Sequence, residues 1–229
     1  MKKSLWLFVS VLIILIIGGC GLMEKDVADM DPKDLPDVRA FQDDFTREFM
    51  ASTEPVEDGY YEFESKTGGY TMKYPENATM SNRYYERKQK NFERLRYAEN
   101  ESKTSNAYVA IVTYDHFSEE RETKRSLNLL SRSENYNGDY KEFKNNESTI
   151  HFATSKETIT SGNKQATWFN FFGLISSNSS NQSLEYRYSV QCDSPANNSS
   201  FDLNTIEEDV LDIMRSVKFN NIELKEEEN

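Results

Sequence analysis

The stretch Ala107-Tyr108-Val109-Ala110-Ile111-Val112-Thr113-Tyr114 predicts a β-strand with apolar residues on both faces. Residues 166–175, which read ATWFNFFGLI, have the same character. Strands that are apolar on both faces lie inside a sheet that is covered on both sides. We therefore expect an α+β fold in which helices cover both faces of a mainly antiparallel sheet, an α/β/α sandwich.

Other β-prone runs extend this sheet. Residues 60–65 and 70–74 flank Lys66-Thr67-Gly68-Gly69, which predicts a hairpin with a glycine turn. The basic segment 83–91 has little periodicity, and we assign no element to it. Further strands are expected at residues 92–97, 140–143, 149–153, 184–192 and 218–219.

An amphipathic helix is expected near the N-terminus of the folded part. Val38, Phe41, Phe45 and Phe49 recur at helical spacing, and Asp37 is a suitable N-cap. This stripe is expected to pack on the domain, with recruitment of a partner helix as the alternative.

Two more helices are expected further along the chain. Residues 118–131 form the first, with Leu127 and Leu130 buried. Asn204 and Glu207 form a potential capping box at the start of the second. The buried stripe of this last helix is expected to comprise Leu203, Ile206, Val210, Ile213 and Val217.

The N-terminus has the features of an export signal. Lys2 and Lys3 precede an apolar run over residues 5–17, which is shorter than the roughly 20 residues that a membrane-spanning helix needs. Gly18-Gly19-Cys20 follows this run and resembles the lipobox of bacterial lipoproteins. The resemblance implies that Cys20 is the lipid attachment site. The alternative is an ordinary secretory signal or an uncleaved anchor, in which Cys20 has no special role.

These features divide the chain into four parts. We expect a lipoprotein signal peptide at 1–19, an acidic tether with an amphipathic helix at 20–55, a globular domain at 56–222 and an acidic tail at 223–229. Loss of the signal peptide, with its two lysines, changes the net charge from −12 to −14. Such acidity argues against nucleic acid as a partner and against a domain lying flat on an anionic membrane. It fits either a solvated acidic body or one with a cationic partner.

Three segments carry a family resemblance. Residues 69–77 (GYTMKYPEN) and 210–219 (VLDIMRSVKF) resemble the opening strand and the closing helix of PsbP-like domains. Residues 29–36 (DMDPKDLP) are similar to the tether of YvcA-like bacillus lipoproteins. The resemblance implies a PsbP-like α/β/α sandwich over about residues 60–222, an extracytoplasmic lipoprotein and a role in binding or assembling other proteins. It implies no shared catalytic set.

Neither histidine has the surroundings of a catalytic base. Asp115 adjoins His116, but neighbours on a strand point to opposite faces, and His151 lies within a strand candidate. Spacings typical of metal sites, nucleotide-binding loops and nucleophile elbows are missing from the sequence. We therefore expect no catalytic residue, no metal site and no cofactor.

Carboxylates and aromatic residues leave weaker alternatives. The pairs at 43–44, 119–120 and 207–208 are interpreted as solvated helix faces rather than a glycosidase pair. The aromatic cluster at 168–172 is interpreted as core, with a ligand pocket as the alternative.

The expected function is a non-enzymatic binding or assembly module on the outer face of the cell membrane. The lipid on Cys20 attaches it there, and a protein of the cell envelope or extracellular matrix is the expected partner. Two alternatives remain open: an envelope hydrolase with an unrecognised site, and a lipoprotein that binds a small ligand.

Overall fold

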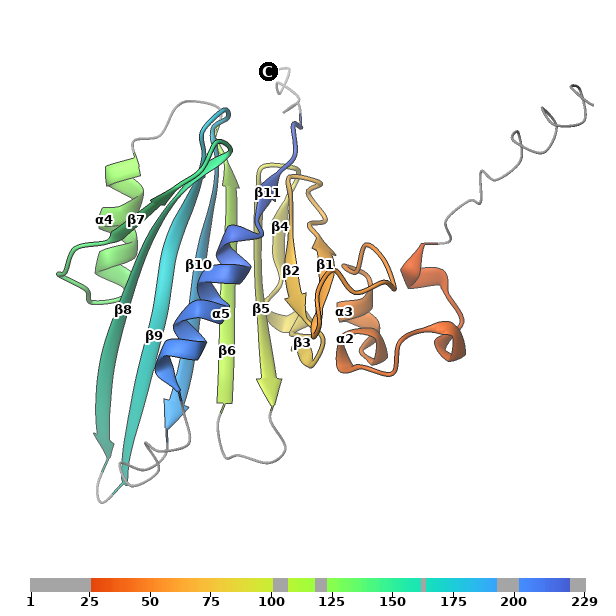
Figure 1. Cartoon of the computed structure of the whole chain (residues 1–229), viewed down its shortest axis with the longest axis horizontal. Coiled ribbons are helices and arrows are strands. Elements are labelled where there is room, and N and C mark those ends of the chain that lie inside the picture. Colours follow the sequence, from red (N-terminus) through yellow and green to blue (C-terminus); the bar gives the residue numbers. More distant parts are fainter. Residues whose placement is uncertain (1–25, 101–106, 118–122, 162–163, 193–201, 223–229) are drawn as a thin grey trace, which may run out of the picture.

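The computed structural model describes residues 26–100, 107–117, 123–161, 164–192 and 202–222. Its main element is an eight-stranded sheet in the order β3-β5-β6-β10-β9-β8-β7, with β4 paired to β5 (Figure 1). All its described strand pairs are antiparallel. The strands are β3 (Ala78–Met80), β4 (Glu86–Lys88), β5 (Phe92–Asn100), β6 (Ala107–His116), β7 (Lys141–Lys144), β8 (Ser148–Ser161), β9 (Lys164–Ser177) and β10 (Gln182–Cys192).

A smaller sheet packs beside the first. It contains β1 (Tyr60–Glu64), β2 (Tyr70–Pro75) and β11 (Lys218–Phe219), all antiparallel. The predicted β1–β2 hairpin is confirmed, and Gly68 in its turn has a φ of 71°, which suits glycine. Gln182 joins the two sheets, because its Nε2 donates to the carbonyls of Gly69 and Asn220 and to the hydroxyl of Tyr114.

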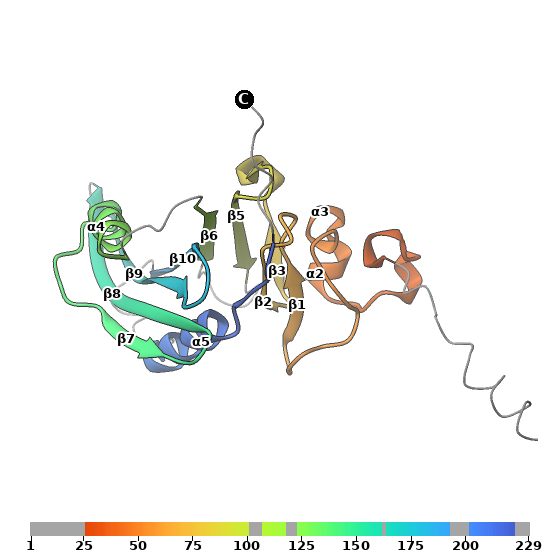
Figure 2. The same cartoon turned by 90° about the horizontal axis from the view of Figure 1, so that it is seen from above.

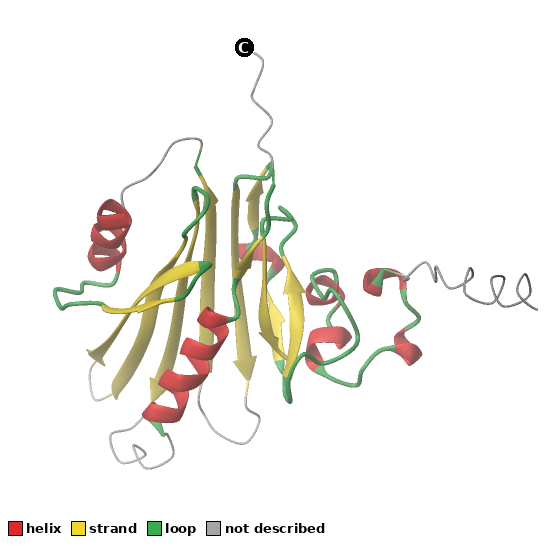
Figure 3. Cartoon of the chain, turned by 45° about the horizontal axis from the view of Figure 1, so that its top comes forward, coloured by secondary structure: helices red, strands yellow, loops and turns green. Residues whose placement is uncertain are grey.

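The two faces of the large sheet carry different helices (Figure 2). Helix α4 (Thr123–Ser133) covers one face, where Leu130, Phe172 and Leu174 form a small buried cluster. Helix α5 (Leu203–Arg215) crosses the other face and belongs to the main core (Figure 3). Gly173 in β9 faces α5, where an added Cβ would clash with the His151 carbonyl and with Met214. The expected α+β class and the interior position of β6 are thereby confirmed.

The helix predicted over residues 38–49 is wrong in form. Two single-turn helices, α2 (Arg39–Gln42) and α3 (Asp44–Arg47), replace it. The break lies at Asp43, whose backbone is extended and whose carboxylate accepts a 2.8 Å hydrogen bond from the amide of Thr46. Asp43 thus caps α3, and competition between such a side chain and the helix backbone explains the interruption. The N-cap of α2 is Val38, not Asp37.

The segment before α2 also packs on the domain. It contains two short 3₁₀ helices, η1 (Val27–Asp29) and η2 (Pro32–Asp34). Val27 and Leu35 are buried in the main core together with Phe41 and Phe49. Much of the chain expected to act as a tether is therefore in contact with the folded body.

Smaller differences concern element ends. Helix α5 is capped by Asp202, which accepts hydrogen bonds from the amides of Asn204 and Thr205, rather than by the predicted box. β8 and β9 are longer than predicted, with 14 residues each. The basic segment contains the 3₁₀ helix η3 (Asn82–Tyr84) and β4. The predicted helix start at Ser118 lies outside the described residues.

Candidate functional site

A cleft of about 240 Å³ lies between α5 and one end of the strands. Its walls combine tyrosine rings, two carboxylates and the apolar edge of the helix. The lining residues are Tyr60, Glu99, Tyr108, Tyr188, Ile206, Asp209, Val210 and Ile213.

Strand register brings the aromatic wall together. Glu99 of β5 lies directly opposite Tyr108 of β6. Tyr188 comes from β10, the next strand, and its ring centroid is 6.1 Å from that of Tyr108. Tyr60 enters from the first residue of β1. Strands β1, β10 and the consecutive pair β5 and β6 thus contribute to one wall.

Helix α5 supplies the opposite wall because it is amphipathic. Val210 and Ile213 face the core, and Asp209, directly before Val210, is exposed overall although its carboxyl is partly desolvated in the cleft. Within the described residues no cation forms an ion pair with Asp209. Burial raises the pKa of its carboxyl above the usual value, and the neighbouring Asp212 and Glu208 raise it further.

The pKa values of two tyrosines in the cleft are raised, first by burial and then by the nearby carboxylates. Burial raises the pKa of Tyr60 to about 12, with further contributions from Asp209 and Glu99. Burial also raises the pKa of Tyr188, and Glu99 again adds to the shift. Burial disfavours a charge of either sign, whereas the contributions of Asp209 and Glu99 specifically disfavour a further negative charge. The cleft therefore favours a cation over an anion.

Lys73, which lies beside the cleft residue Tyr60, interacts both with carboxylates and with a tyrosine ring. Lys73 of β2 forms ion pairs with Asp212, at 2.5 Å, and with Glu57. Its Nζ also lies 5.7 Å from the ring centroid of Tyr60. A positive group over a tyrosine ring and beside carboxylates is favourable on both counts. The cleft contains the same two kinds of group, carboxylates and tyrosine rings.

The residues singled out from the sequence do not form a site with this cleft. Cys20 lies outside the described residues. His116 ends β6, and the Nδ1 of its ring is buried with no hydrogen-bond partner among the described residues. His151 of β8 faces Glu142 of β7, with 3.2 Å between Nε2 and the carboxylate. In the described part of the chain, neither ring is hydrogen-bonded to a serine or threonine hydroxyl.

The other candidates are dispersed. Phe171 and Phe172 belong to the two clusters on opposite faces of the sheet, and neither they nor Trp168 line the cleft. Asp43 caps α3, Glu207 pairs with Lys141 at 2.7 Å, and residues 119–120 lie outside the described chain. Among the described residues, no three His, Cys, Asp or Glu side chains converge as a metal site would require.

Sequence reasoning missed a buried carboxylate, Glu93 of β5. It is fully buried and accepts four hydrogen bonds, from Ser65 Oγ (2.7 Å), the Lys66 amide (3.0 Å), Tyr70 Oη (3.1 Å) and Tyr85 Oη (2.9 Å). Burial raises its pKa, while these hydrogen bonds act in the opposite direction. Its donors all come from the β1–β2 turn and β4 region, so Glu93 holds that end of the fold together.

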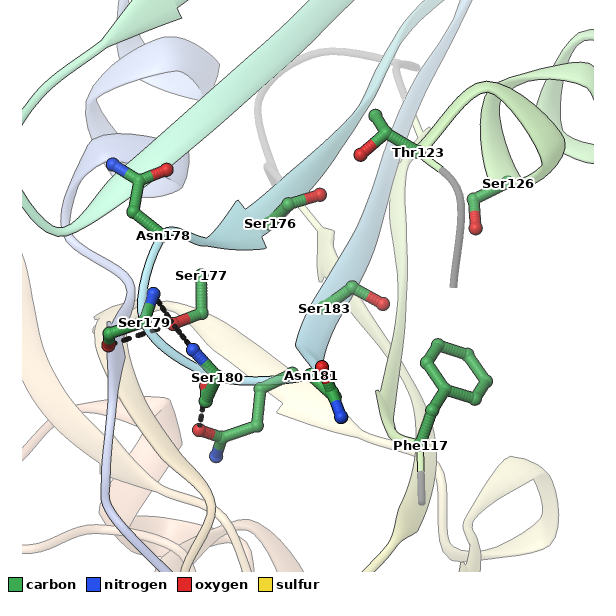
Figure 4. A pocket seen from close by; sticks show the side chains of 11 residues that line it. Phe117, Thr123, Ser126, Ser176, Ser177, Asn178, Ser179, Ser180, Asn181 and Ser183 are labelled. Carbon is green, nitrogen blue, oxygen red and sulfur yellow. Dashed lines mark hydrogen bonds between the residues drawn. The ribbon is translucent and has the colours of Figure 1, made fainter. Parts of the chain in front are cut away.

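A second polar pocket lies at the β9–β10 turn (Figure 4). It has a volume of about 260 Å³, and serine and asparagine side chains from residues 176–183 form much of its lining. The hydroxyls of Ser177 and Ser180 are engaged within the turn, with Ser179 and Gln182. Among the described residues that line it there is no histidine, lysine or carboxylate that could serve as a base for its hydroxyls.

Comparison with known proteins shows that the chain is similar to a family of bacterial proteins. The sequence profile of the family described as "Putative lipoprotein YvcA" matches residues 36–218. A Bacillus subtilis (strain 168) protein with that description is 31% identical over 237 residues, covering 96% of this chain and 97% of the relative. No described helix has both the length and the apolar character needed to cross a bilayer.

Proposed function

The chain belongs to the YvcA lipoprotein family, and from this premise we propose that it is a binding module on the outer face of the cell membrane. In this proposal a lipid on Cys20 attaches the protein, and the tyrosine-lined cleft receives a cationic group of an envelope or matrix protein. The proposed role involves no catalysis.

The N-terminal sequence supports the attachment. Lys2, Lys3 and the apolar run 5–17 form an export signal, and Cys20 follows two glycines directly. Two acyl chains on one cysteine satisfy the two-signal requirement for stable anchoring. Mass spectrometry of the protein from membranes is expected to show acylated Cys20 as the first residue. An unmodified Cys20 would refute the attachment.

The cleft is the observation that carries the binding role. Its carboxylates, Glu99 and Asp209, come from the sheet and the helix, and three tyrosines are part of the same lining. This combination suits a lysine or arginine side chain, which offers hydrogen-bond donors and a charge for the rings. A partner with an exposed basic segment is therefore proposed.

A lysine-containing peptide provides a direct test. The short peptide acetyl-Gly-Lys-Gly-amide is titrated into the mature protein by isothermal calorimetry. Asp209→Asn is expected to weaken binding at least about tenfold, because hydrogen bonds to charged groups contribute about 1.5–3 kcal/mol. Asp139→Asn, which removes an exposed carboxylate elsewhere, is the matched control and is expected to bind as the wild type does. Equal affinities for all three proteins, or no binding, would contradict the proposal.

The cleft also supports a second candidate, a receptor for a small organic cation. Its volume of about 240 Å³ is small enough to enclose a single ammonium head group. Choline is the discriminating probe, because it carries a quaternary ammonium with no N–H donor. Tighter binding of choline than of the lysine peptide would favour this second function over a protein partner.

A further inference from the structure

One segment of this acidic protein is strongly basic. Residues 83–96 contain six cations and two acids, which gives the segment a charge of +4 within a chain of −12. The remainder of the chain therefore carries −16. The cations are Arg83, Arg87, Lys88, Lys90, Arg94 and Arg96.

The fold turns this segment into an exposed hairpin. η3, β4 and the first half of β5 form it, and all its cations except the half-buried Arg96 have exposed side chains. Of its two acids, Glu93 is fully buried, so that only Glu86 reaches solvent, where it pairs with Lys88 at 3.1 Å. Arg87 donates a 2.7 Å hydrogen bond to the carbonyl of Lys66, whose exposed ammonium extends the basic surface. We call Lys66 with residues 83–94 the basic hairpin.

The described chain begins next to this hairpin. Asp26 and Val27 line a cleft of about 640 Å³ whose opposite side includes Lys66 and Lys90. The acidic side chains along the same cleft are Asp26, Glu48 and Glu64. The start of the described chain and two lysines of the basic hairpin therefore line the same cleft.

The sequence distance to the anchor is short. Cys20 precedes Asp26 by six residues, which span at most about 21 Å when fully extended. A lipid on Cys20 therefore brings the basic hairpin within reach of the phospholipid head groups. Lys and Arg side chains near an anionic bilayer are attracted to it, and the attraction decreases within a Debye length.

We propose that the basic hairpin lies against anionic phospholipid head groups beside the anchor and forms a second membrane contact. This inference rests on the proposed attachment at Cys20. β5 runs away from the hairpin (Figure 1), so that Glu99 and the tyrosine-lined cleft lie at its far end. The contact orients the cleft away from the bilayer, where a partner can reach it.

The acidic C-terminal tail is the competing occupant of the same surface. Asn220 lies near the end of the described chain. Its side-chain Nδ2 donates a hydrogen bond to the carbonyl of Gly68, and its backbone amide donates one to the carbonyl of Gly69. These glycines adjoin Lys66 in the β1–β2 turn. The tail that follows contains Glu223, Glu226, Glu227 and Glu228 against a single lysine, Lys225.

Hydrogen exchange of the lipidated protein tests the contact. The protein is incorporated into phosphatidylcholine vesicles with or without 30% phosphatidylglycerol, and amide exchange over residues 86–94 is followed by mass spectrometry. Anionic vesicles are expected to slow this exchange about fivefold or more, the factor that corresponds to one cation at such a surface. Addition of 0.5 M salt is expected to abolish the difference.

Two triple variants make the test specific. Arg87→Gln/Lys88→Gln/Lys90→Gln is expected to lose the protection. Lys124→Gln/Arg125→Gln/Lys144→Gln, which removes three exposed cations from α4 and β7, is the matched control and is expected to retain it.

Each of the remaining outcomes would overturn a particular part of the proposal. An acylated Cys20 without protection in anionic vesicles would overturn the hairpin contact and leave the proposed function intact. An unmodified Cys20 would overturn the attachment and, with it, this inference. Equal protection in neutral vesicles, or with soluble polyphosphate, would refute anionic lipid as the occupant. Protection that is already present in detergent and disappears when residues 223–229 are deleted would assign the surface to the tail.

Discussion

The two ends of β5 place the same residue type in opposite situations. Glu93 and Glu99 are six positions apart, so their side chains point to the same face of the strand. At the beginning of the strand, four donors enclose Glu93 completely. At its end, Glu99 is half-buried and lines a cleft with tyrosines and Asp209.

The difference separates a buried carboxylate that connects structural elements from a half-buried carboxylate that lines the cleft of the proposed binding site. Hydrogen bonds from Ser65, Lys66, Tyr70 and Tyr85 satisfy the carboxyl group of Glu93, so this side chain connects the turns around it. In the cleft, burial raises the pKa of Tyr188, and the nearby Glu99 raises it further. We expect changes at Glu93 to affect folding and changes around Glu99 to affect binding.

Glu93→Ala is expected to have the largest effect on stability. It leaves four donors without their acceptor in a buried site, and loss of one member of such a network costs about 3–5 kcal/mol. The free energy of unfolding in urea measures this loss. Glu86→Ala, on the neighbouring strand β4, removes an exposed partner of Lys88 and is expected to change stability by less than about 1 kcal/mol. Similar values for the two variants would remove the distinction between the ends of β5.

Lys73→Met is expected to have a smaller effect on stability and a visible effect on the cleft. Burial alone lowers the pKa of Lys73, but hydrogen bonds with Asp212 and Glu57 raise it above its usual value overall. Because both acidic partners are about half exposed, we expect a loss of about 1 kcal/mol in unfolding free energy.

Loss of Lys73 also leaves the cleft region more negative. Binding of the lysine peptide is therefore expected to become tighter in calorimetry. Lys218→Met, which removes an exposed lysine from β11, is the control. Weaker peptide binding by Lys73→Met than by Lys218→Met would show that the acidic end does not act through its charge.

The smallest expected effect is on the pH dependence of stability. His116 and Glu93 change the unfolding free energy in opposite directions as the pH falls. Burial lowers the pKa of His116 below 6.5, so the unfolded chain takes up a proton before the folded chain does, and stability falls as the pH drops below 6.5. His151, whose pKa is also lowered by burial, acts in the same direction. Burial raises the pKa of Glu93 above 4.5, so its contribution is largest below pH 4.5 and is lost as the pH rises through the folded-state value.

Unfolding free energies between pH 7.5 and 4.5 separate these contributions. His116→Gln is expected to flatten the decrease below pH 6.5, and Glu93→Gln is expected to make the decrease steeper toward pH 4.5. Parallel profiles for the wild type and both variants would show that neither group is linked to folding.

Several elements could be predicted because their signals are local. The apolar stretches of β6 and β9, the glycine turn of the β1–β2 hairpin and the stripe of α5 each depend on a few neighbouring residues. The helix predicted over residues 38–49 was wrong because a side chain competes with the helix backbone for hydrogen bonds, which a periodic pattern does not show. Asp43 lies between Phe41 and Phe45 in a stripe that suits a helix, yet its side chain caps a new helix and ends the old one.

Neither carboxylate site could be recognised in the same way. Glu93 lies in a run of alternating charges, and its donors precede it by up to 28 residues along the chain. The cleft unites β1, β5, β6, β10 and α5, and its members become neighbours only through strand register. A single sequence contains no information on such register beyond the alternation of each strand.

The amino-acid sequence alone determined the class of fold, the basic and apolar pattern that precedes Cys20 and the strong net acidity, since these depend on composition and on short patterns. Tertiary structure decided where the charges lie: it buried Glu93 among donors, exposed the cations beside it and collected Glu99, Asp209 and three tyrosines in one cleft. The physical reason is that burial and electrostatic potential depend on distances in space, which chain order does not specify for residues on different strands and helices.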